Sequence, residues 1–362
     1  MSSTQKVNTS QPPIRPDQPA FVKLADPASY VPCTTEFVND QAARDYWADF
    51  FCDHIETIVG LGVEATDDPK ARERADACVA DLRQHMRHFQ AHPEEYPHAT
   101  ILVLDVWRDT FLRKHGFEDC FAEQKRRENE QMIKLLPEVV SKLDALDGRA
   151  KWRRAIEGVF AGNIFDMGAK STAGRFRDES PDFFKTLDEL KPRPWRVDDL
   201  DAVLEQAERG WRKAVVFVDN AGSDFVLGMV PLIRLLGQAG TQVVIAANER
   251  PSLNDMTIAE VRDWWPRLAE AVDLPGDVEL VSSGTGEPLI DLRGVSDELN
   301  RTAEDADLVI LEGMGRGVES NLEAEFICDR MNLAMLKDEL IAKSLGGDVY
   351  DCVCKFVPAV ER

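Results

Sequence analysis

Two apolar runs in the second half of the chain each end in acidic or amide side chains. Asp219 and Asn220 come directly after the run AVVFV, Asn248 comes directly after QVVIAA, and Asp255 follows in the segment ERPSLND. Carboxylate and amide oxygens are suitable ligands for hard divalent cations such as Mg²⁺ or Mn²⁺. A cation held by Asp219, Asn220 and Asp255 could polarise a phosphoryl oxygen and lower the pKa of a coordinated water. The pattern therefore predicts metal-assisted phosphoryl chemistry.

Two further apolar runs end in groups that suit a phosphate. Glu312 begins the segment EGMGRG after one run, and Lys337 follows the run NLAML. The backbone N–H groups of Gly313 and Gly315 could approach a phosphate closely. Arg316 and Lys337 could neutralise developing negative charge. Glu312 could act in catalysis or support its neighbours, and the residues alone leave both roles open.

Simpler structural roles are also open for some of these residues. Asp219 could be the N-cap of a following helix. Asn163 and Asp166 could stabilise a turn. They lie in AGNIFDMGAKSTAG (161–174), which interrupts the helical pattern before the strand-rich part of the chain. That position makes both residues candidates for the border of the same site.

The candidate residues must be positioned by a sheet whose strands run in the same direction. Helical stretches separate most of the predicted strands, and this alternation is typical of a parallel, doubly wound sheet. Ligands bind at the carboxyl ends of the strands in such sheets, so we expect the polar strand ends to share one edge. The predicted strands are 214–218, 242–247, 278–282, 307–311, 332–336 and 349–356.

The spacing of apolar residues divides the chain into three predicted parts. Residues 1–32 are rich in proline and polar side chains, which indicates an extended N-terminal arm, and 33–190 are expected to form a helical domain. Residues 191–362 begin with the linker-like segment KPRPW and are expected to form the domain that contains the parallel sheet and the predicted metal site. The predicted fold class is therefore α/β. It combines a three-layer α/β/α domain, with a mostly parallel sheet, and an N-terminal all-helical domain.

Charge and cysteine content limit the possible partners and location. The 362 residues carry a net charge of −22, which disfavours binding to nucleic acid and to anionic membranes. Seven cysteines, an odd number without a close CxxC pair, are typical of reduced thiols in a cytoplasmic protein. The N-terminal segment lacks the apolar core of a signal peptide, and no apolar run reaches membrane-spanning length. We therefore predict a cytoplasmic protein without a membrane or nucleic-acid partner.

The histidines exclude one class of chemistry and raise one alternative site. All six precede residue 116, so the strand-rich part cannot contain a Ser-His-Asp or Cys-His arrangement of its own. His85, His88 and His92 fall on one face of a predicted helix at a spacing close to that of zinc ligands. The helix is otherwise highly charged and has no nearby cysteine that completes a site. A solvated or interface face is therefore favoured over a metal site.

Several long segments resemble a known family, the metal-dependent damage-control phosphatases, formerly domain of unknown function 89. The resemblance is closest to the phosphatase module fused to pantothenate kinase and to its stand-alone plant relatives. The segments are FVDNAGSDFVLGMVPLIRLLGQAGTQVVIAANERPSLND, DADLVILEGMGRGVESNL, AMLKDELIAKSLGG, AGNIFDMGA and GGDVYDCVCKF.

The resemblance implies a helical domain packed on a Rossmann-like domain and a divalent metal held by the residues that match Asp219, Asn220 and Asp255. Lys337 matches a phosphate-contacting lysine, and Asn163 matches an asparagine at the edge of the site. The family uses Co²⁺, Ni²⁺, Mn²⁺ or Mg²⁺. Its substrates are 4′-phosphopantetheine and its oxidised forms in one subgroup and sugar phosphates in others.

We therefore predict a metal-dependent phosphomonoester hydrolase that acts on a small phosphorylated metabolite in metabolite damage control. In the predicted mechanism water attacks the phosphorus, and a role of Asp219 as a covalent nucleophile stays open. The predicted catalytic residues are Asp219, Asp255 and Lys337, and the predicted metal ligands are Asp219, Asn220 and Asp255. The predicted phosphate-binding residues are Asn163, Asp166, Asn248, Glu312, Gly313, Gly315, Arg316 and Lys337.

Two rival functions follow from the same strand-rich pattern. One is a methyl- or nucleotide-dependent transferase on a Rossmann-like sheet. The turn DNAGSDFVLG after the first strand is neither GxGxxG nor a P-loop, which disfavours that reading. The other is a protein that binds a phosphometabolite without catalysis. The full set of polar groups at the strand ends makes this the weakest of the three.

Overall fold

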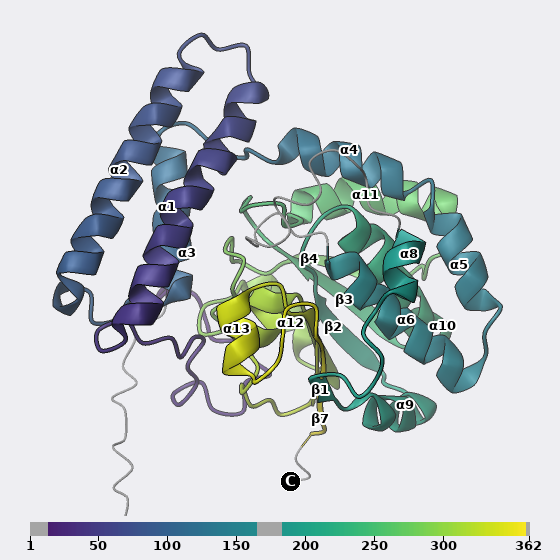
Figure 1. The fold of residues 1–362 in the computed structure, drawn as a ribbon. Coiled ribbons are helices and arrows are strands. Elements are labelled where there is room, and N and C mark those ends of the chain that lie inside the picture. The colour runs from purple at the N-terminus through teal and green to yellow at the C-terminus, as the bar shows by residue number, and fades with distance from the viewer. Residues whose placement is uncertain (1–13, 165–182, 360–362) are drawn as a thin grey trace, which may run out of the picture.

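The computed structural model of the protein describes residues 14–164 and 183–359. A helical region precedes a seven-stranded sheet flanked by further helices (Figure 1). This arrangement confirms the predicted α/β class with a mostly parallel sheet and an N-terminal helical region. The division at residues 32 and 190 into an arm and two domains stays a prediction.

The strands form one sheet in the order β1-β7-β6-β5-β2-β3-β4. Neighbours from β6 to β4 pair in parallel, whereas β7 runs antiparallel to β6 and pairs in parallel with the short β1. The six predicted strands are all present: the prediction 242–247 matches β3 at both ends, the other five have shifted ends, and β1 was not predicted. The strands are β1 (Val197–Asp198), β2 (Lys213–Phe217), β3 (Gln242–Ala247), β4 (Glu279–Ser282), β5 (Leu308–Glu312), β6 (Asp329–Met335) and β7 (Cys352–Val357).

The parallel register brings the polar strand ends to one edge of the sheet. Phe217 of β2 pairs with Ala246 of β3 on one side and with Leu311 of β5 on the other. Leu311 pairs in turn with Asn332 of β6. The residues that follow β2, β3, β5 and β6 therefore emerge side by side, as predicted from the parallel topology.

Helices surround the sheet and also form the region that precedes it. In the first half of the chain the helices are α1 (Gln41–Glu64), α2 (Ala71–Ala91), η1 (Pro93–Glu95), α3 (Ile101–Lys114), α4 (Ala122–Met132), α5 (Leu136–Asp144), α6 (Gly148–Asn163) and α8 (Phe183–Asp188). In the second half they are α9 (Leu200–Arg209), η2 (Ser223–Met229), α10 (Val230–Gln238), α11 (Ile258–Ala271), α12 (Asp297–Ala303), η3 (Gly315–Glu319) and α13 (Glu339–Ser344).

Alternate residues of the central strands pack on opposite faces of the sheet, as the period of a strand requires. On one face, Val216 and Ile310 belong to a hydrophobic cluster that includes residues of α5, α6, α9, α10 and α11. On the other face, Val215 and Val309 pack with α12 and with Phe21, which comes from the irregular segment before α1. Helices α5 and α6 thus share a hydrophobic core with the sheet.

The first three helices lie together at one side of the molecule, and α4 and α5 lead from them across the sheet-containing part (Figure 1). α1 begins after the N-cap Asp40, whose side chain accepts the Ala43 N–H. Trp47, Phe51 and Ile55 recur at helical spacing and are buried against neighbouring helices.

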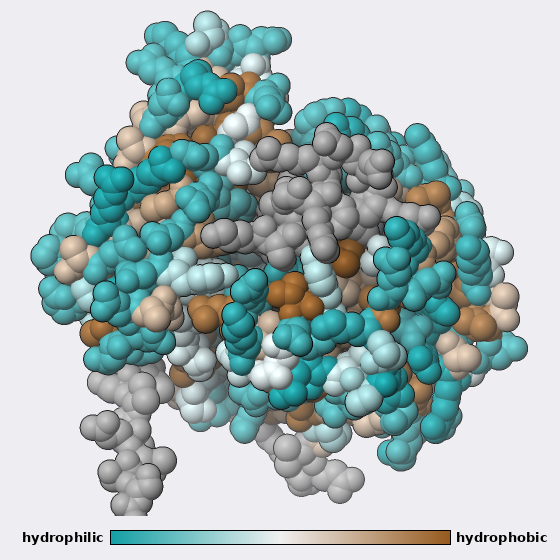
Figure 2. Space-filling view, viewed as in Figure 1, coloured by the Kyte–Doolittle hydropathy of each residue, from teal (hydrophilic) through white to brown (hydrophobic). Residues whose placement is uncertain are grey.

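The visible surface is mostly polar. The face in Figure 2 is largely hydrophilic, and hydrophobic residues appear on it as small separate patches. In the part of the chain that the structure describes, no helix is both long and apolar enough to cross a membrane. All seven cysteines are free.

Candidate active site

Three buried carboxylates meet at the carboxyl edge of the sheet. Asp219 follows β2, Asp224 lies in η2, and Glu312 ends β5. Each offers an oxygen atom within 4.8 Å of the others, and all three side chains are buried. Glu312 Oε2 also accepts the Asp219 N–H at 2.9 Å, which fixes the end of β2 against the end of β5.

An amide group lies among these carboxylates. Asn163 is the last residue of α6, and its Nδ2 donates to Asp224 Oδ2 at 2.8 Å and to Glu312 Oε1 at 2.9 Å. Gly162 makes this position possible, because a Cβ there would lie 2.7 Å from the Ser223 backbone oxygen. Close packing of α6 on η2 therefore places the Asn163 amide in the site.

Asn220 joins the two aspartates. Its Nδ2 donates to Asp219 Oδ2 at 2.8 Å and to Asp224 Oδ2 at 3.0 Å, and its backbone N–H donates to Asp224 Oδ2 at 3.2 Å. Asp224 Oδ1, by contrast, is buried and has no hydrogen-bond partner among the described residues. A buried carboxylate oxygen without a donor is costly unless a further group or a cation reaches it.

Arg316 connects this cluster to the neighbouring loop. Its guanidinium forms ion pairs with Asp219 and, at 2.7 Å, with Asp255 Oδ2. It also donates to Asn248 Oδ1 at 3.0 Å, and Asn248 Nδ2 donates to Asp255 Oδ2 at 3.0 Å. Asp219 and Asp255 therefore share one buried cation, and Asn248 orients both partners of the Asp255 pair.

Lys337 is the second buried cation. It follows β6, is fully buried, and its Nζ donates to the backbone oxygen of Asn163 at 2.8 Å. Its positive charge lowers the pKa values of Asp219, Asp224 and Glu312, although it is not the largest influence on any of them. Lys337 therefore lies within electrostatic reach of all three carboxylates.

Burial governs the ionisation of the three carboxyl groups. It raises the pKa of Asp219 and of Glu312 well above the usual range, and it raises that of Asp224 too. Arg316 opposes this rise at Asp219, whereas the charges of the neighbouring carboxylates add to it. Three carboxylates cannot all be charged here without more compensating positive charge. The site thus has the electrostatics of a cation-binding site.

Gly313 is required by the geometry of the cluster. Its φ is +93°, and a Cβ at this position would overlap the carboxylate of Asp219. Gly315 begins η3, the short π-helical turn that also carries Arg316. Gly313 thus allows close packing against Asp219, and Gly315 allows close approach of a different segment, because a Cβ there would lie 2.8 Å from the backbone oxygen of Pro288.

Most of the predicted site residues meet in one place. The structure brings together Asp219, Asn220, Asn248, Asp255, Asn163, Glu312, Gly313, Gly315, Arg316 and Lys337, and Asp166 lies outside the described residues. Asp224 was not predicted. Its acidic residue type, shortly after the DN pair, is the signal in the sequence, but the same segment is also typical of an ordinary helix start.

Comparison with known proteins identifies the family of this arrangement. A model of the damage-control phosphatase ARMT1-like domain matches residues 41–353. The chain belongs to the damage-control phosphatase family. The family consists of metal-dependent hydrolases, and the match confirms the resemblance seen in the sequence.

Similar curated proteins include both short and long relatives. A damage-control phosphatase of Arabidopsis thaliana is 39% identical over 86% of this chain and 87% of its own length. Pantothenate kinase 2 of the same plant is 35% identical over 95% of this chain, and a 4′-phosphopantetheine phosphatase of Mus musculus is 28% identical over 92%. The match covers only 42% and 48% of those two proteins, so the chain spans less than half of each.

A solved structure shows that the fold is shared more widely. The crystal structure of a duf89 family protein from Pyrococcus horikoshii superposes with a TM-score of 0.60 at 21% sequence identity. The superposition covers 85% of this chain and 96% of the archaeal one. The two chains therefore share a fold at low sequence identity.

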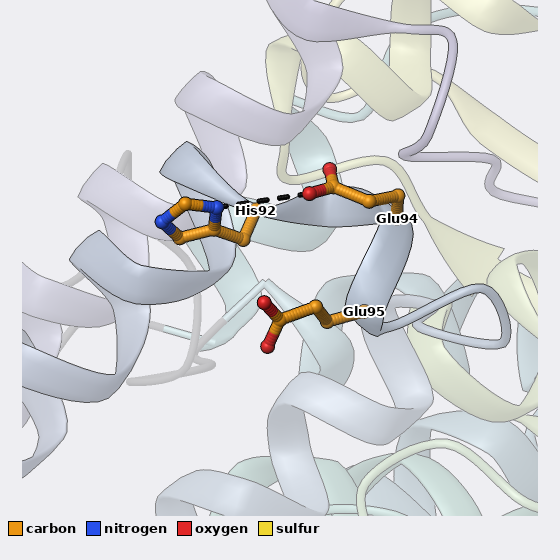
Figure 3. A group of neighbouring side chains, drawn as sticks. All are labelled: His92, Glu94 and Glu95. Atoms are coloured by element: carbon orange, nitrogen blue, oxygen red, sulfur yellow. Dashed lines mark ion pairs between the residues drawn. The ribbon is translucent and has the colours of Figure 1, made fainter.

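A second group of possible metal ligands lies on the surface at the end of α2 (Figure 3). His92 Nδ1 lies 3.6 Å from Glu94 Oε1, and His88 Nε2 lies 3.8 Å from Glu95 Oε2. His85 instead packs edge-on against Trp107, with ring centroids 4.4 Å apart. His85 therefore packs among aromatic rings, whereas the ring centroids of His88 and His92 lie 4.8 Å apart and each ring faces a glutamate on the surface.

Proposed function

We propose that the chain is a metal-dependent phosphomonoester hydrolase of small phosphorylated metabolites. The main support is the buried group of Asp219, Asp224 and Glu312 beside the cations Arg316 and Lys337, at the edge where parallel sheets bind ligands. We also propose that the sheet and its helices form a Rossmann-like, three-layer α/β/α domain at 191–362, preceded by a helical domain at 33–190.

The residues present fit a divalent cation. Hard cations prefer carboxylate and amide oxygens, and Asp224 has a buried oxygen without a hydrogen-bond partner among the described residues. We propose Asp219, Asn220 and Asp255 as ligands, as the family resemblance implies, with Asp224 and Glu312 close enough to Asp219 to complete the set. Mn²⁺, Co²⁺, Ni²⁺ and Mg²⁺ are the candidate ions.

The reaction is the addition of water to phosphorus and cleavage of the ester P–O bond, with a proton delivered to the leaving alkoxide. A bound divalent cation supplies positive charge to the phosphate and lowers the pKa of water. Arg316 and Lys337 stabilise the charge on the remaining phosphoryl oxygens. A buried carboxyl group such as Glu312, whose pKa is raised, is able to hold the proton that the alkoxide needs. Asn163 keeps this group and Asp224 in place.

The relatives support a class of substrate. The mouse relative is a 4′-phosphopantetheine phosphatase, and the plant relative is a damage-control phosphatase. We propose that this chain hydrolyses 4′-phosphopantetheine-like compounds or sugar phosphates in metabolite damage control. Its seven free cysteines are compatible with action in the cytoplasm.

The proposal is tested by a screen of metals against substrates. The purified protein is assayed with each candidate ion on p-nitrophenyl phosphate, 4′-phosphopantetheine and several sugar phosphates. Hydrolysis should require an added ion, and Asp219→Asn should abolish it while the fold is retained. Glu208→Gln, which alters only an exposed ion pair with Arg149, is the matched control and should keep full activity. Full activity of Asp219→Asn would refute the assignment.

The rival functions give different results in companion measurements. A shift in melting temperature with S-adenosylmethionine, but none with Mn²⁺ or Co²⁺, would favour a transferase. Tight binding of a phosphate ester without turnover across all ions would favour a non-catalytic binding protein.

A further inference from the structure

Two polar residues on α4 are buried although the helix is otherwise highly charged. The helix has the sequence AEQKRRENEQM, and Lys125 and Asn129 are its buried residues. They are separated by one helical turn and so project from the same face. A fully buried lysine is rare unless it is paired, so the contacts of this face are expected to include partners for Lys125.

Asn129 contacts the loop that carries Asp219 and Asn220. Its Oδ1 accepts the Gly222 N–H at 2.7 Å, and its Nδ2 lies 3.7 Å from Met256 Sδ. Both groups of the side-chain amide are therefore used between two segments that are far apart in the sequence. Loss of the Oδ1 acceptor would leave the buried Gly222 N–H without its partner.

Lys125 contacts the loop that carries Asp255. Its Nζ lies 3.4 Å from the backbone oxygen of Asp255 and forms ion pairs with Asp119 at 3.0 Å and Glu260 at 2.8 Å. Glu260 also closes the capping box at the start of α11, directly after this loop. Lys125 therefore connects the backbone of Asp255 to Glu260, which lies in the first turn of α11.

The two loops are also paired with each other. The Ala221 N–H donates to the backbone oxygen of Asn254 at 2.9 Å, and the Met256 N–H donates to the backbone oxygen of Asp219 at 2.8 Å. Helix α4 contacts both members of this pair. A second contact from the helical region holds the start of the Asp255 loop, where Arg108 Nη2 donates to Ser252 Oγ at 3.0 Å.

We propose that Lys125 and Asn129 are positioning residues that hold the Asp219–Asn220 loop and the Asp255 loop in the arrangement that binds the metal. This inference rests on the proposed function, because it assigns a role relative to that metal site. Ligands on two loops must be held to about 0.5 Å for tight binding, and free loops lose affinity through the entropy of ordering. Helix α4 removes this cost by fixing both loops before the cation arrives.

The decisive variant is Asn129→Leu, which nearly keeps the side-chain size and removes the acceptor for Gly222. We expect the Kd for Mn²⁺, measured by isothermal titration calorimetry, to rise about ten- to a hundredfold, the usual effect of removing a group that orients a metal ligand. Asn129→Asp retains an acceptor oxygen and should bind Mn²⁺ more tightly than Asn129→Leu. The kcat at saturating Mn²⁺ should fall less than the affinity.

Two further variants separate positioning from general stability. Lys125→Met removes the contact to the Asp255 loop and should also raise the Kd for Mn²⁺. Arg126→Ala is the matched control on α4, because Arg126 is exposed and pairs with Glu123 and Glu130, and it should leave the Kd unchanged. A purely structural role would lower the melting temperature of the metal-free variants and leave the Kd of the folded protein unaltered.

Asp255→Asn, measured in parallel, distinguishes the two proposals. If Asp255→Asn binds Mn²⁺ like the wild type, the proposed ligand set is wrong, and the positioning role is wrong with it. If Asp255→Asn loses binding while folded Asn129→Leu and Lys125→Met keep the wild-type Kd, only the positioning role is overturned. Asn129→Ala replaces Asn129→Leu if the latter does not fold, with the same outcomes.

Discussion

Two clusters in this molecule offer similar metal-ligating groups in opposite environments. Asp219, Asp224 and Glu312 meet in the interior at the sheet edge, whereas His92, Glu94 and Glu95 meet on the surface at the end of α2 (Figure 3). The ligand atoms in each cluster lie within 4.8 Å of one another. Residue type and proximity therefore do not distinguish the clusters, and the difference lies in how much solvent reaches them.

Exposure to solvent determines how strongly the charges within each cluster interact. The side chains of His92 and Glu94 are 50% and 66% exposed, so water screens their charges and their ion pair contributes about 0–1 kcal/mol. At the sheet edge, burial raises the pKa of all three carboxyl groups, and Arg316 and Lys337 compensate only part of the negative charge. A cation would therefore stabilise the interior cluster by compensating its remaining negative charge, whereas water already screens the charges of the surface cluster.

The clusters also differ in how the chain assembles them. The surface group comes from neighbouring residues in and beside η1, and all three side chains are exposed to solvent. The interior group comes from the ends of two strands and a π-helical turn, and α6 adds an asparagine. Convergence from distant segments holds the interior carboxylates in place, and such preorganisation is typical of functional sites.

The largest expected effect is the loss of the buried cation that joins Asp219 and Asp255. Arg316→Met would leave two buried carboxylates without their partner, and breaking a buried pair in this way costs about 3–5 kcal/mol. Saturating Mn²⁺ should offset part of this cost, so Mn²⁺ should raise the melting temperature of the variant more than that of the wild type. Differential scanning calorimetry measures both shifts.

Arg126→Met is the control for an exposed arginine, and its loss of two surface ion pairs should cost less than about 1 kcal/mol. Equal Mn²⁺-induced shifts in Arg316→Met and the wild type would contradict the view that Arg316 and the cation share the same carboxylates.

A third cluster contains a buried carboxyl group that is not one of the predicted metal ligands. Asp105, Arg108 and Asp109 form buried ion pairs on α3, and Arg108 and Asp109 also contact Ser252 at the start of the loop that carries Asp255. Burial raises the pKa of Asp105 from 3.8 to about 7, although Arg108 opposes the rise. Between these values the folded protein keeps a proton that the unfolded chain releases, so the free energy of unfolding should fall as pH rises through this window.

Asp105→Asn tests this sign, because the variant lacks the titrating group. The wild-type free energy of unfolding minus that of the variant should decrease between about pH 4 and pH 7 and stay constant above, by no more than about 4 kcal/mol in total. Urea unfolding at a series of pH values gives the difference. Asp305→Asn is a control of opposite sign, because the hydrogen bond from Lys213 lowers the pKa of Asp305. A flat difference for Asp105→Asn would show that the carboxyl group is not desolvated.

The next effect concerns the interior residue that the sequence did not reveal. Asp224→Asn keeps the side-chain shape and removes one of three carboxylates, so turnover and Mn²⁺ affinity should each fall about ten- to a hundredfold. Steady-state kinetics with varied Mn²⁺ separates the two losses. Glu95→Gln makes the same chemical change in the surface cluster and should leave both unchanged. Equal losses in the two variants would remove the distinction between the clusters.

The general plan of the interior site was predictable from the sequence. Strands buried on both faces are continuous apolar runs, and their polar ends are therefore visible in the sequence. Parallel pairing then places Asp219, Asn248, Glu312 and Lys337 at one edge without any knowledge of side-chain packing. The antiparallel direction of β7 was not visible, because an apolar run carries no information about strand direction.

Other parts of the site depend on packing and could not be predicted in this way. Asp224 enters the cluster through the π-helical geometry of η2, in which the Phe225 N–H bonds to the oxygen of Asn220. The charged sequence of α4 indicates a solvated helix, so Lys125 and Asn129 were not recognised as buried. Arg316 was expected to contact phosphate, and its pairing with both Asp219 and Asp255 follows only from the three-dimensional arrangement.

The smallest effect is expected at the surface cluster. Glu94→Gln removes the carboxylate that faces His92, and the free energy of unfolding should change by less than about 1 kcal/mol because water solvates both groups. The small change should shrink further in 1 M salt, where the screening length is about 3 Å. Chemical unfolding at low and high salt measures it. Mn²⁺ could instead stabilise the folded protein in a way that Glu94→Gln abolishes and Asp219→Asn does not. That result would mean that the exposed surface group binds the cation without preorganisation. Solvent exposure would then not explain why the chain places its proposed metal site at the sheet edge.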